Sequence, residues 1–206
     1  MFKKYWKFFV IFWSVVLVGI IGVFVFFWLI SAGKLGFMPT FEELENPNNR
    51  FASEVYFADG PIMNRYFEKE NRKYIEYREI PQSVIDALIA TEDVRFYEHE
   101  GVDKISMLRV FFKTVLLGER LLTANTSAGG GSTISQQLAK MLFPRESDLN
   151  VFELAIRKFR EWVIAVRLEK SYTKEEILTM YLNKYDFLNL AVGISSAADI
   201  YFQVPL

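Results

Sequence analysis

Residues 151–169 read VFELAIRKFREWVIAVRLE, a stretch without glycine or proline that decides the fold class. With successive side chains about 100° apart on a helix, its apolar residues gather on one side. That side is predicted to face the core, and it comprises Phe152, Ala155, Phe159, Trp162, Val163 and Val166. The stretch therefore predicts a helix of about five turns with one side in the core.

Helix signals recur on both sides of this stretch. Thr133 is followed by Gln136, and Thr173 by Glu176, at the spacing of a capping box that opens a helix. Residues 118–131, which are rich in Thr, Asn, Ser and Gly, are typical of a loop. Further helices are predicted at residues 81–92, 105–117, 133–143 and 173–183, so the chain is expected to be mainly α.

The segment before these helices has a different character. Residues 31–50 are rich in Gly, Pro, Asn and Glu and have the composition of a linker. Apolar and polar residues then alternate at 53–57, 62–67 and 74–77, with a turn signal at residues 59–61. We expect a small β element between the linker and the helices.

The N-terminal residues predict a membrane anchor. Residues 8–30 carry no charge and exceed the roughly 20 residues that a helix needs to cross a bilayer. Lys3, Lys4 and Lys7 precede them, which by the positive-inside rule places the N-terminus in the cytoplasm. A cleaved signal peptide is the alternative, although its apolar region is usually about 7 to 15 residues long. The predicted parts are a cytoplasmic tail at 1–7, a transmembrane helix at 8–30, a juxtamembrane linker with a small β segment at 31–80, and the main domain at 81–206.

The composition of the whole chain excludes several functions. Its 24 Lys and Arg residues against 25 Asp and Glu residues give a formal charge of −1, which provides no global attraction for nucleic acid. The chain has no cysteine, so disulfides, thiolate zinc sites and a cysteine nucleophile are excluded. Because the overall charge is close to zero, any cationic site must be local.

Residues 91–101, TEDVRFYEHEG, place an acidic pair at the predicted end of a helix. A carboxylate there is unfavourably placed in the helix dipole, so the basicity of Glu92 can rise, as a general base requires. The structural alternative is a charged helix end at which His99, the single histidine, is hydrogen-bonded to hold the turn.

A second carboxylate lies on the helix at 151–169. Glu161 falls opposite the predicted core side, between Arg157 one turn earlier and Lys158 three residues earlier. The alternative to a functional role is a solvated face with ordinary ion pairs, each of which contributes about 0.2 to 0.5 kcal/mol.

Residues 130–140, GGSTISQQLAK, feed glycines into a helix N-terminus that carries hydroxyls, amides and a lysine. Helical spacing brings Gln136, Gln137 and Lys140 near one another, where they could hold sugar hydroxyls and an anion. Lys140 comes too far into the helix for a Walker loop, so nucleotide binding is not expected.

Taken together, these segments resemble glycosyltransferase family 51, the peptidoglycan glycosyltransferase domain of class A penicillin-binding proteins and monofunctional transglycosylases. The segments occur in the family's order, and residues 173–183 and 193–202 are similar to its fourth and fifth motifs. The first three motifs are similar to Glu92, Asp93, Phe96, His99 and Gly101, to Gly131, Ser132, Thr133, Gln136, Gln137 and Lys140, and to Arg157, Lys158 and Glu161.

The resemblance implies a lysozyme-like, mainly α domain that polymerises lipid II into β-1,4 glycan strands, with inversion and release of polyprenyl pyrophosphate. By resemblance Glu92 is the base, and Glu161 either orients the donor or holds a divalent cation, Mg²⁺ or Mn²⁺, near the pyrophosphate. No organic cofactor is implied. The implied substrate-binding residues are Ser132, Thr133, Gln136, Gln137, Lys140, Arg157 and Lys158, and the supporting ones are Asp93, Phe96, His99, Gly101 and Asn183.

The same resemblance implies the surroundings of the chain. Its partners would be lipid II, the growing lipid-linked strand, the membrane and other cell-wall synthesis proteins, and its place would be the bacterial inner membrane with the domain outside. Family domains continue beyond the fifth motif, so the chain is expected to be truncated at its C-terminus. A glycan hydrolase with paired carboxylates and a non-catalytic membrane adaptor are the rival interpretations.

Overall fold

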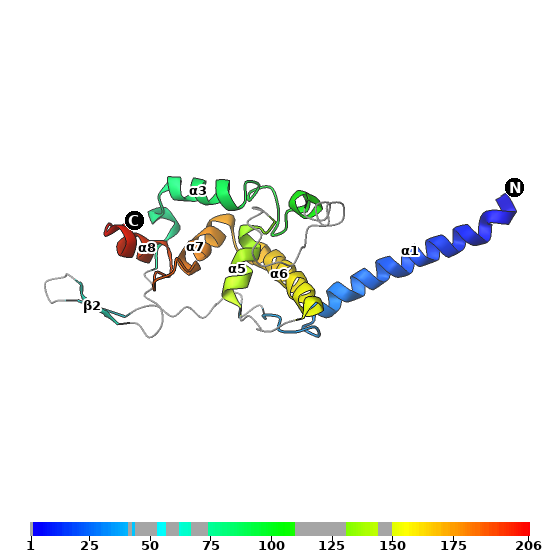
Figure 1. The fold of residues 1–206 in the computed structure, drawn as a ribbon, viewed down its shortest axis with the longest axis horizontal. Coiled ribbons are helices and arrows are strands. Elements are labelled where there is room, and N and C mark those ends of the chain that lie inside the picture. The colour runs from blue at the N-terminus through cyan, green and yellow to red at the C-terminus, as the bar shows by residue number, and fades with distance from the viewer. Residues whose placement is uncertain are drawn as a thin grey trace.

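The computed structural model describes residues 2–40, 43, 53–56, 62–66, 74–109, 131–143 and 150–206. A long helix, α1 (Phe2–Ser31), projects from one end of a helical domain, and the C-terminus lies at the opposite end (Figure 1). The prediction of a mainly α fold with one apolar N-terminal helix is confirmed. The domain contains α3 (Gln82–Glu92), α5 (Ile134–Leu142), α6 (Val151–Ser171), α7 (Lys174–Lys184) and α8 (Ile194–Phe202).

Local sequence accounts for where three of these helices begin. Asn150 and Glu153 form a complete capping box at α6, and Thr173 and Glu176 form the predicted one at α7. At α5 the hydroxyl of Thr133 accepts from the backbone N–H of Gln136 at 3.2 Å. These contacts satisfy N–H groups that otherwise have no partner in the first turn of a helix.

The predicted β element is present in part. Strands β1 (Ser53–Tyr56) and β2 (Ile62–Tyr66) pair antiparallel, as two of the three alternating runs predicted. The third prediction is wrong, because residues 74–76 have no regular structure and Tyr77–Glu79 forms a 3-10 helix, η1, whose start is capped by Glu76 and Glu79. The predicted turn at 59–61 and most of the predicted loop at 118–131 lie outside the described residues. Of the helix predicted at 105–117, only the first part is described, and residues 104–109 are helical there.

The core forms where α5 meets α6 and α7. Phe96, from the turn after α3, is fully buried in it. The other buried members of the core are Ile75, Ile80, Ile85, Ile134, Leu138, Ala139, Ile164, Leu168, Ile177, Leu178, Tyr181 and Leu182.

The side of α6 that faces this core is not the one predicted. Phe152, placed in the core from the sequence, is 70% exposed, whereas Ile164, Ala165 and Leu168 are buried. The physical reason is that α6 is apolar on two sides and a second element covers the aromatic one. The ring of Phe159 packs edge-on against Phe26 and Phe27 of α1, with centroids 5.4 and 5.7 Å apart.

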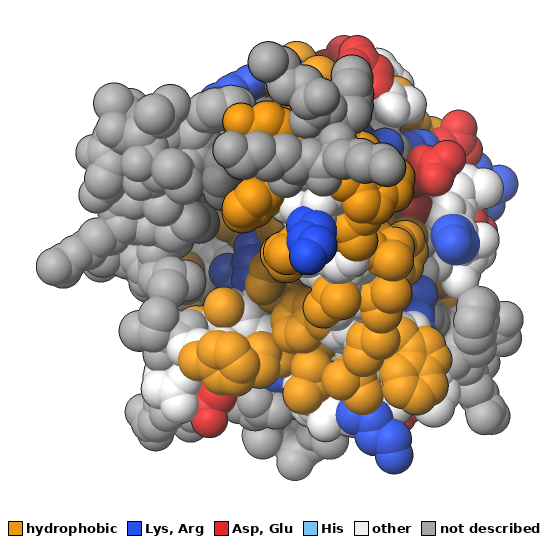
Figure 2. Space-filling model, turned by 90° about the vertical axis from the view of Figure 1, so that its right-hand side faces the viewer, with side chains coloured by type: hydrophobic (Ala, Val, Ile, Leu, Met, Phe, Trp, Pro, Cys, Tyr) orange, Lys and Arg blue, Asp and Glu red, His pale blue; other side chains and the backbone are white. Residues whose placement is uncertain are grey.

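Polar contacts also join α1 to α6. The guanidinium of Arg167 donates to the carbonyl and hydroxyl oxygens of Ser31 at 2.9 and 2.8 Å and to the carbonyl of Pro39 at 3.0 Å. Gly36 lies so close to Arg160 that an added Cβ would stand 2.2 Å from its Nη1. Viewed from the end at which α1 projects, hydrophobic side chains cover the middle of the molecule (Figure 2). The ring contacts and hydrogen bonds between α1 and α6 therefore dock the first helix on the domain.

Candidate active site

Glu92 is the last residue of α3, and its side chain is exposed. Its Oε2 accepts a hydrogen bond of 2.7 Å from Nε2 of Gln137 on α5. The Oε1 of Gln137 in turn accepts from the hydroxyl of Tyr181 on α7 at 3.0 Å. The structure thus brings Glu92 and Gln137, which are predicted from separate segments, into contact and leaves the Glu92 side chain exposed.

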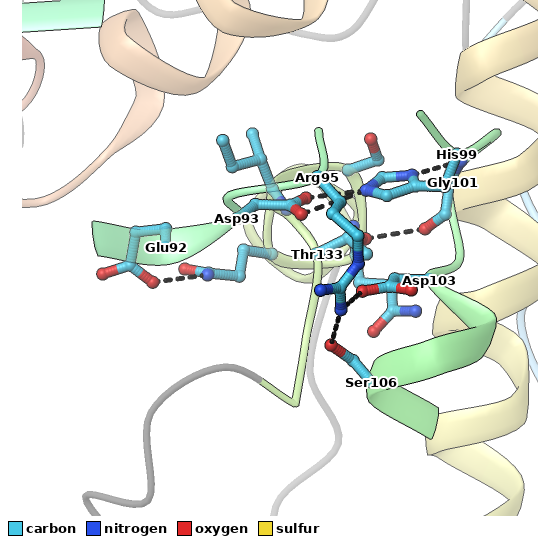
Figure 3. A network of polar contacts seen from close by, with 12 residues as sticks. Glu92, Asp93, Arg95, His99, Gly101, Asp103, Ser106 and Thr133 are labelled. Carbon is cyan, nitrogen blue, oxygen red and sulfur yellow. Dashed lines mark hydrogen bonds and ion pairs between the residues drawn. The ribbon is translucent and has the colours of Figure 1, made fainter. Parts of the chain in front are cut away.

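Asp93 points the other way, into the domain, and is buried. Its carboxylate accepts from Nε2 of His99 at 2.9 Å and from the backbone N–H of Ile134 at 3.1 Å. Since the backbone N–H of Gly101 donates to Nδ1 of His99 at 3.2 Å, the imidazole proton lies on Nε2. The structural interpretation of His99 as a residue that holds the turn is confirmed, and Asp93 links that turn to the start of α5 (Figure 3).

At Gly101 the turn after α3 contacts both the start of α5 and the backbone of α6. The hydroxyl of Thr133 donates to the carbonyl of Gly101 at 2.6 Å, and a Cβ at Gly101 would stand 2.7 Å from the carbonyl carbon and oxygen of Ala165 on α6. Its φ of +90° is also in the region that favours glycine. No residue with a side chain fits this crossing without a backbone shift.

An ion pair that the sequence analysis missed supports the same turn. Arg95 pairs with Asp103 and donates to the hydroxyl of Ser106 at 3.0 Å (Figure 3). Burial alone would raise the pKa of Asp103, but hydrogen bonds from Arg95, Ser106 and backbone N–H groups outweigh it and hold that pKa well below its usual range. The two partners are eight residues apart across an irregular turn, a spacing that carries no sequence signal.

Glu161 is 9% exposed, so the interpretation of its surroundings as a solvated face is wrong. The ion pair expected on the helix is present, because Nζ of Lys158 lies 2.8 Å from Glu161 Oε2. The same ammonium donates to the hydroxyl of Ser132 at 2.9 Å. Lys158 therefore joins the second and third predicted segments, as Gln137 joins the first and second.

A pocket opens beside this pair. It is rich in cations, with Lys140, Arg157 and Arg160 around one carboxylate, Glu161. Phe37 also lines it, six residues after the end of α1, so the pocket lies next to the segment that leaves the apolar helix. Sequence analysis did not predict Arg160 or Phe37, because neither is set apart from its neighbours by spacing. The remaining lining residues are Ala139, Phe143 and Ile164.

Three other predicted residues are buried. Gln136 is 2% exposed, and no partner of its Oε1 is found within the described part of the chain, so its predicted contact with substrate stays a prediction. Phe96 lies beneath the ammonium of Lys174, 4.3 Å from the ring centroid. Asn183 exchanges hydrogen bonds of 2.9 and 2.8 Å with the backbone of Ile75, which ties α7 to the segment before α3.

The donor set around Glu161 does not fit a divalent cation held by the protein alone. Among the residues that the structure describes, no three His, Cys, Asp or Glu side chains gather. Glu161 is instead paired with Lys158 and shares its pocket with further cations. A divalent cation prefers several oxygen ligands, which this pocket does not supply from its described side chains.

The helical domain thus combines two carboxylates on separate helices with a cationic pocket and an apolar helix docked beside it. The family model described as Transglycosylase matches residues 59–206. The chain belongs to this family of glycosyltransferases.

Curated relatives agree with this assignment. The chain is 37% identical to penicillin-binding protein 1A of Haemophilus influenzae over 86% of its length, and 36% identical to that of Escherichia coli over 80%. It is 41% identical to penicillin-binding protein 1F of Bacillus subtilis over 65% of its length. These alignments cover 19%, 18% and 17% of the three relatives, so the chain spans about a fifth of their length.

Proposed function

We propose that this chain polymerises lipid II into β-1,4 glycan strands at the outer face of the bacterial inner membrane. The observation that carries the proposal is the position of the cationic pocket, which has Phe37 of the segment after α1 in its wall. A donor whose polyprenyl tail stays in the bilayer must present its pyrophosphate close to the membrane, and this pocket offers Lys140, Arg157 and Arg160 for it.

Glu92 acts as the general base. Its exposed carboxylate takes the proton from the 4-hydroxyl of lipid II, and that oxygen attacks the anomeric carbon of the growing strand. The new C1–O4 bond forms as the bond from C1 to the phosphate oxygen breaks, so the configuration at C1 inverts. The electron pair of the broken bond leaves with the polyprenyl pyrophosphate.

The cations of the pocket stabilise the charge that develops on this leaving group. Preorganised donors at such a position act mainly on the transition state. Glu161 holds Lys158 toward Ser132 and orients the donor through that ammonium. The alternative role for Glu161, holding Mg²⁺ or Mn²⁺, requires additional oxygen ligands from the substrate's phosphates.

The test is polymerisation of lipid II by the detergent-solubilised chain, with glycan length and released polyprenyl pyrophosphate both measured. Glu92→Gln is expected to lower turnover by about 10²- to 10⁴-fold, the usual contribution of a general base. Glu161→Gln is expected to lower it as well. Glu98→Gln, an exposed carboxylate of the same turn, is the matched control and should retain activity.

Other outcomes separate the rival functions. Shortening of a preformed glycan without release of lipid pyrophosphate would identify a hydrolase. Absence of any product from the folded protein, with unchanged binding of cell-wall synthesis proteins in the Glu92→Gln and Glu161→Gln variants, would identify an adaptor.

A further inference from the structure

Tyr181 ends a chain of hydrogen bonds that begins at the exposed carboxylate of Glu92. Tyr181 lies on α7, is 3% exposed and belongs to the core. Its hydroxyl donates to Gln137 Oε1 at 3.0 Å, and Gln137 Nε2 donates to Glu92 Oε2 at 2.7 Å. Three helices that are distant in sequence, α3, α5 and α7, therefore meet through three side chains.

The chemistry of the three groups fixes the direction of both bonds. An ionised carboxylate only accepts, so the amide of Gln137 must turn its NH₂ toward Glu92 and its oxygen toward Tyr181. The hydroxyl of Tyr181 must then be the donor. Burial raises the pKa of Tyr181 above its ordinary value, and the charge of Glu92 raises it further, so the hydroxyl keeps its proton at neutral pH.

The buried end of this chain is anchored on the fold. The ring of Tyr181 packs on that of Tyr185, with centroids 5.5 Å apart, and Asn183 on the same helix is tied to the backbone of Ile75. A buried tyrosine hydroxyl usually finds some partner. Here the partner is the side-chain amide of Gln137, which also holds the exposed carboxylate of Glu92. Helix α3 ends at Glu92, so no further turn of that helix lies beside this carboxylate.

We propose that Tyr181 is a positioning residue for the glycosyl transfer: through Gln137 it holds the Glu92 carboxylate in the orientation that accepts the proton of the acceptor hydroxyl. The inference rests on the proposed function. Tyr181 itself touches no substrate. Hydrogen bonds in series polarise one another, so loss of the buried hydroxyl weakens the bond at the surface as well.

The experiment compares Tyr181→Phe with Tyr185→Phe, which removes a hydroxyl from the neighbouring ring of the same helix. Turnover at saturating lipid II is expected to fall about 10- to 100-fold in Tyr181→Phe, as for a misplaced catalytic group, with the half-saturating concentration changed less than about twofold. Tyr185→Phe should match the wild type in both. Gln137→Glu, which can still accept from Tyr181 but no longer donates to Glu92, should lose turnover at least as severely.

Two results in this assay would overturn the proposal. Equal turnover in Tyr181→Phe and Tyr185→Phe would show that the buried hydroxyl does not act on Glu92. A raised half-saturating concentration with unchanged turnover would assign Tyr181 to substrate binding through Gln137.

A second measurement does not depend on activity. In protein labelled with ¹⁵N-glutamine, the side-chain amide resonance of Gln137, identified by its loss in Gln137→Asn, should shift in both Tyr181→Phe and Glu92→Gln but not in Tyr185→Phe. An unshifted resonance in Tyr181→Phe means that the hydrogen-bond chain is absent and overturns the proposal. If the amide shifts as expected but the folded wild type makes no polymer, the proposed function has failed, and the positioning role falls with it.

Discussion

Gly101 shows how much a single residue without a side chain determines at this site. Gly101→Ala would place a Cβ 2.7 Å from the backbone of Ala165 at a φ of +90°. We expect the free energy of unfolding to fall by about 2 to 4 kcal/mol, since strain and a backbone clash add. Chemical unfolding in detergent measures it, with Gly22→Ala in α1, where nothing lies within 4 Å of an added Cβ, as the control. Equal stability of the two variants would contradict the close approach.

Asp103 predicts a dependence of stability on pH. Its pKa is held below the ordinary value of about 3.9 in the folded protein, so between these two values the unfolded chain binds more protons. The stabilisation is therefore complete above about pH 4 and is lost as the pH falls. At pH 7 Asp103→Asn is expected to cost about 2 kcal/mol, the scale of hydrogen bonds to charged groups, and the difference from the wild type should shrink toward pH 2. Asp86→Asn, on the exposed side of α3, is the control, and an equal loss of stability in both variants at pH 7 would contradict the role of the Arg95–Asp103 pair.

Leu188 and Leu190 predict a gain in stability. Both have left-handed backbones, with φ of 71° and 67°, and both side chains are more than half exposed. A left-handed conformation costs a residue such as leucine about 1 to 2 kcal/mol, whereas glycine adopts it freely but loses more entropy on folding. Leu188→Gly and Leu190→Gly should each raise the free energy of unfolding by about 0.5 to 1 kcal/mol. Leu108→Gly, at an exposed helical leucine, should lower it, and a loss in all three would refute the strain.

For single residues, the sequence singled out candidates whose chemistry is unusual for their surroundings. The carboxylates Glu92 and Glu161 stood out because they lay beside a helix end and beside two cations. Tyr181 did not, because it fits the apolar periodicity of its helix and its partner Gln137 is 44 residues away. A hydrogen bond between distant elements leaves no local pattern.

Among the elements that the structure describes, α6 packs against α1 as well as against α5 and α7. Arg167→Ala removes the guanidinium that holds the end of α1, and we expect amide exchange of residues 28–40 to become at least about tenfold faster, because hydrogen bonds to a charged group contribute more than 1.4 kcal/mol. Hydrogen exchange followed by mass spectrometry measures this. Lys170→Ala, an exposed cation of the last turn of α6, is the control, and identical exchange in the two variants would show that Arg167 does not hold the junction.

Helix α6 also shows why the sequence predicts the ends of a helix better than the side that faces the core. Caps and breakers lie within a few residues of a helix end, so the bounds of α5, α6 and α7 followed from sequence. The orientation of α6 did not, because apolar residues occupy two of its sides and periodicity cannot say which side meets the core and which meets α1. The wrong choice for Phe152 follows from that ambiguity.

For the molecule as a whole, the predicted orientation of α1 in a membrane is testable because the chain has no cysteine. Residues 5–31 form an apolar helix long enough to cross a bilayer. Lys104→Cys should react with a membrane-impermeant maleimide in spheroplasts that express the chain, and Lys4→Cys only after permeabilisation, because the N-terminal lysines favour the cytoplasm. The reverse pattern would overturn the orientation, and loss of the N-terminal peptide from the mature protein would show a cleaved signal sequence.

The docking of α1 has a further consequence, which concerns rotation about its axis. The angle at which α1 leaves the domain is set by two kinds of contact. The rings of Phe26 and Phe27 pack against Phe159, and Ser31 accepts a hydrogen bond from Arg167. Each residue of a helix turns about 100°, so one residue inserted upstream of Phe26 would swing the preceding part of α1 around by more than a quarter turn while the pocket stayed in place. Seven inserted residues would restore nearly the original bearing. A neighbour that contacted α1 within a bilayer would therefore meet the domain at an angle about the helix axis that these contacts set.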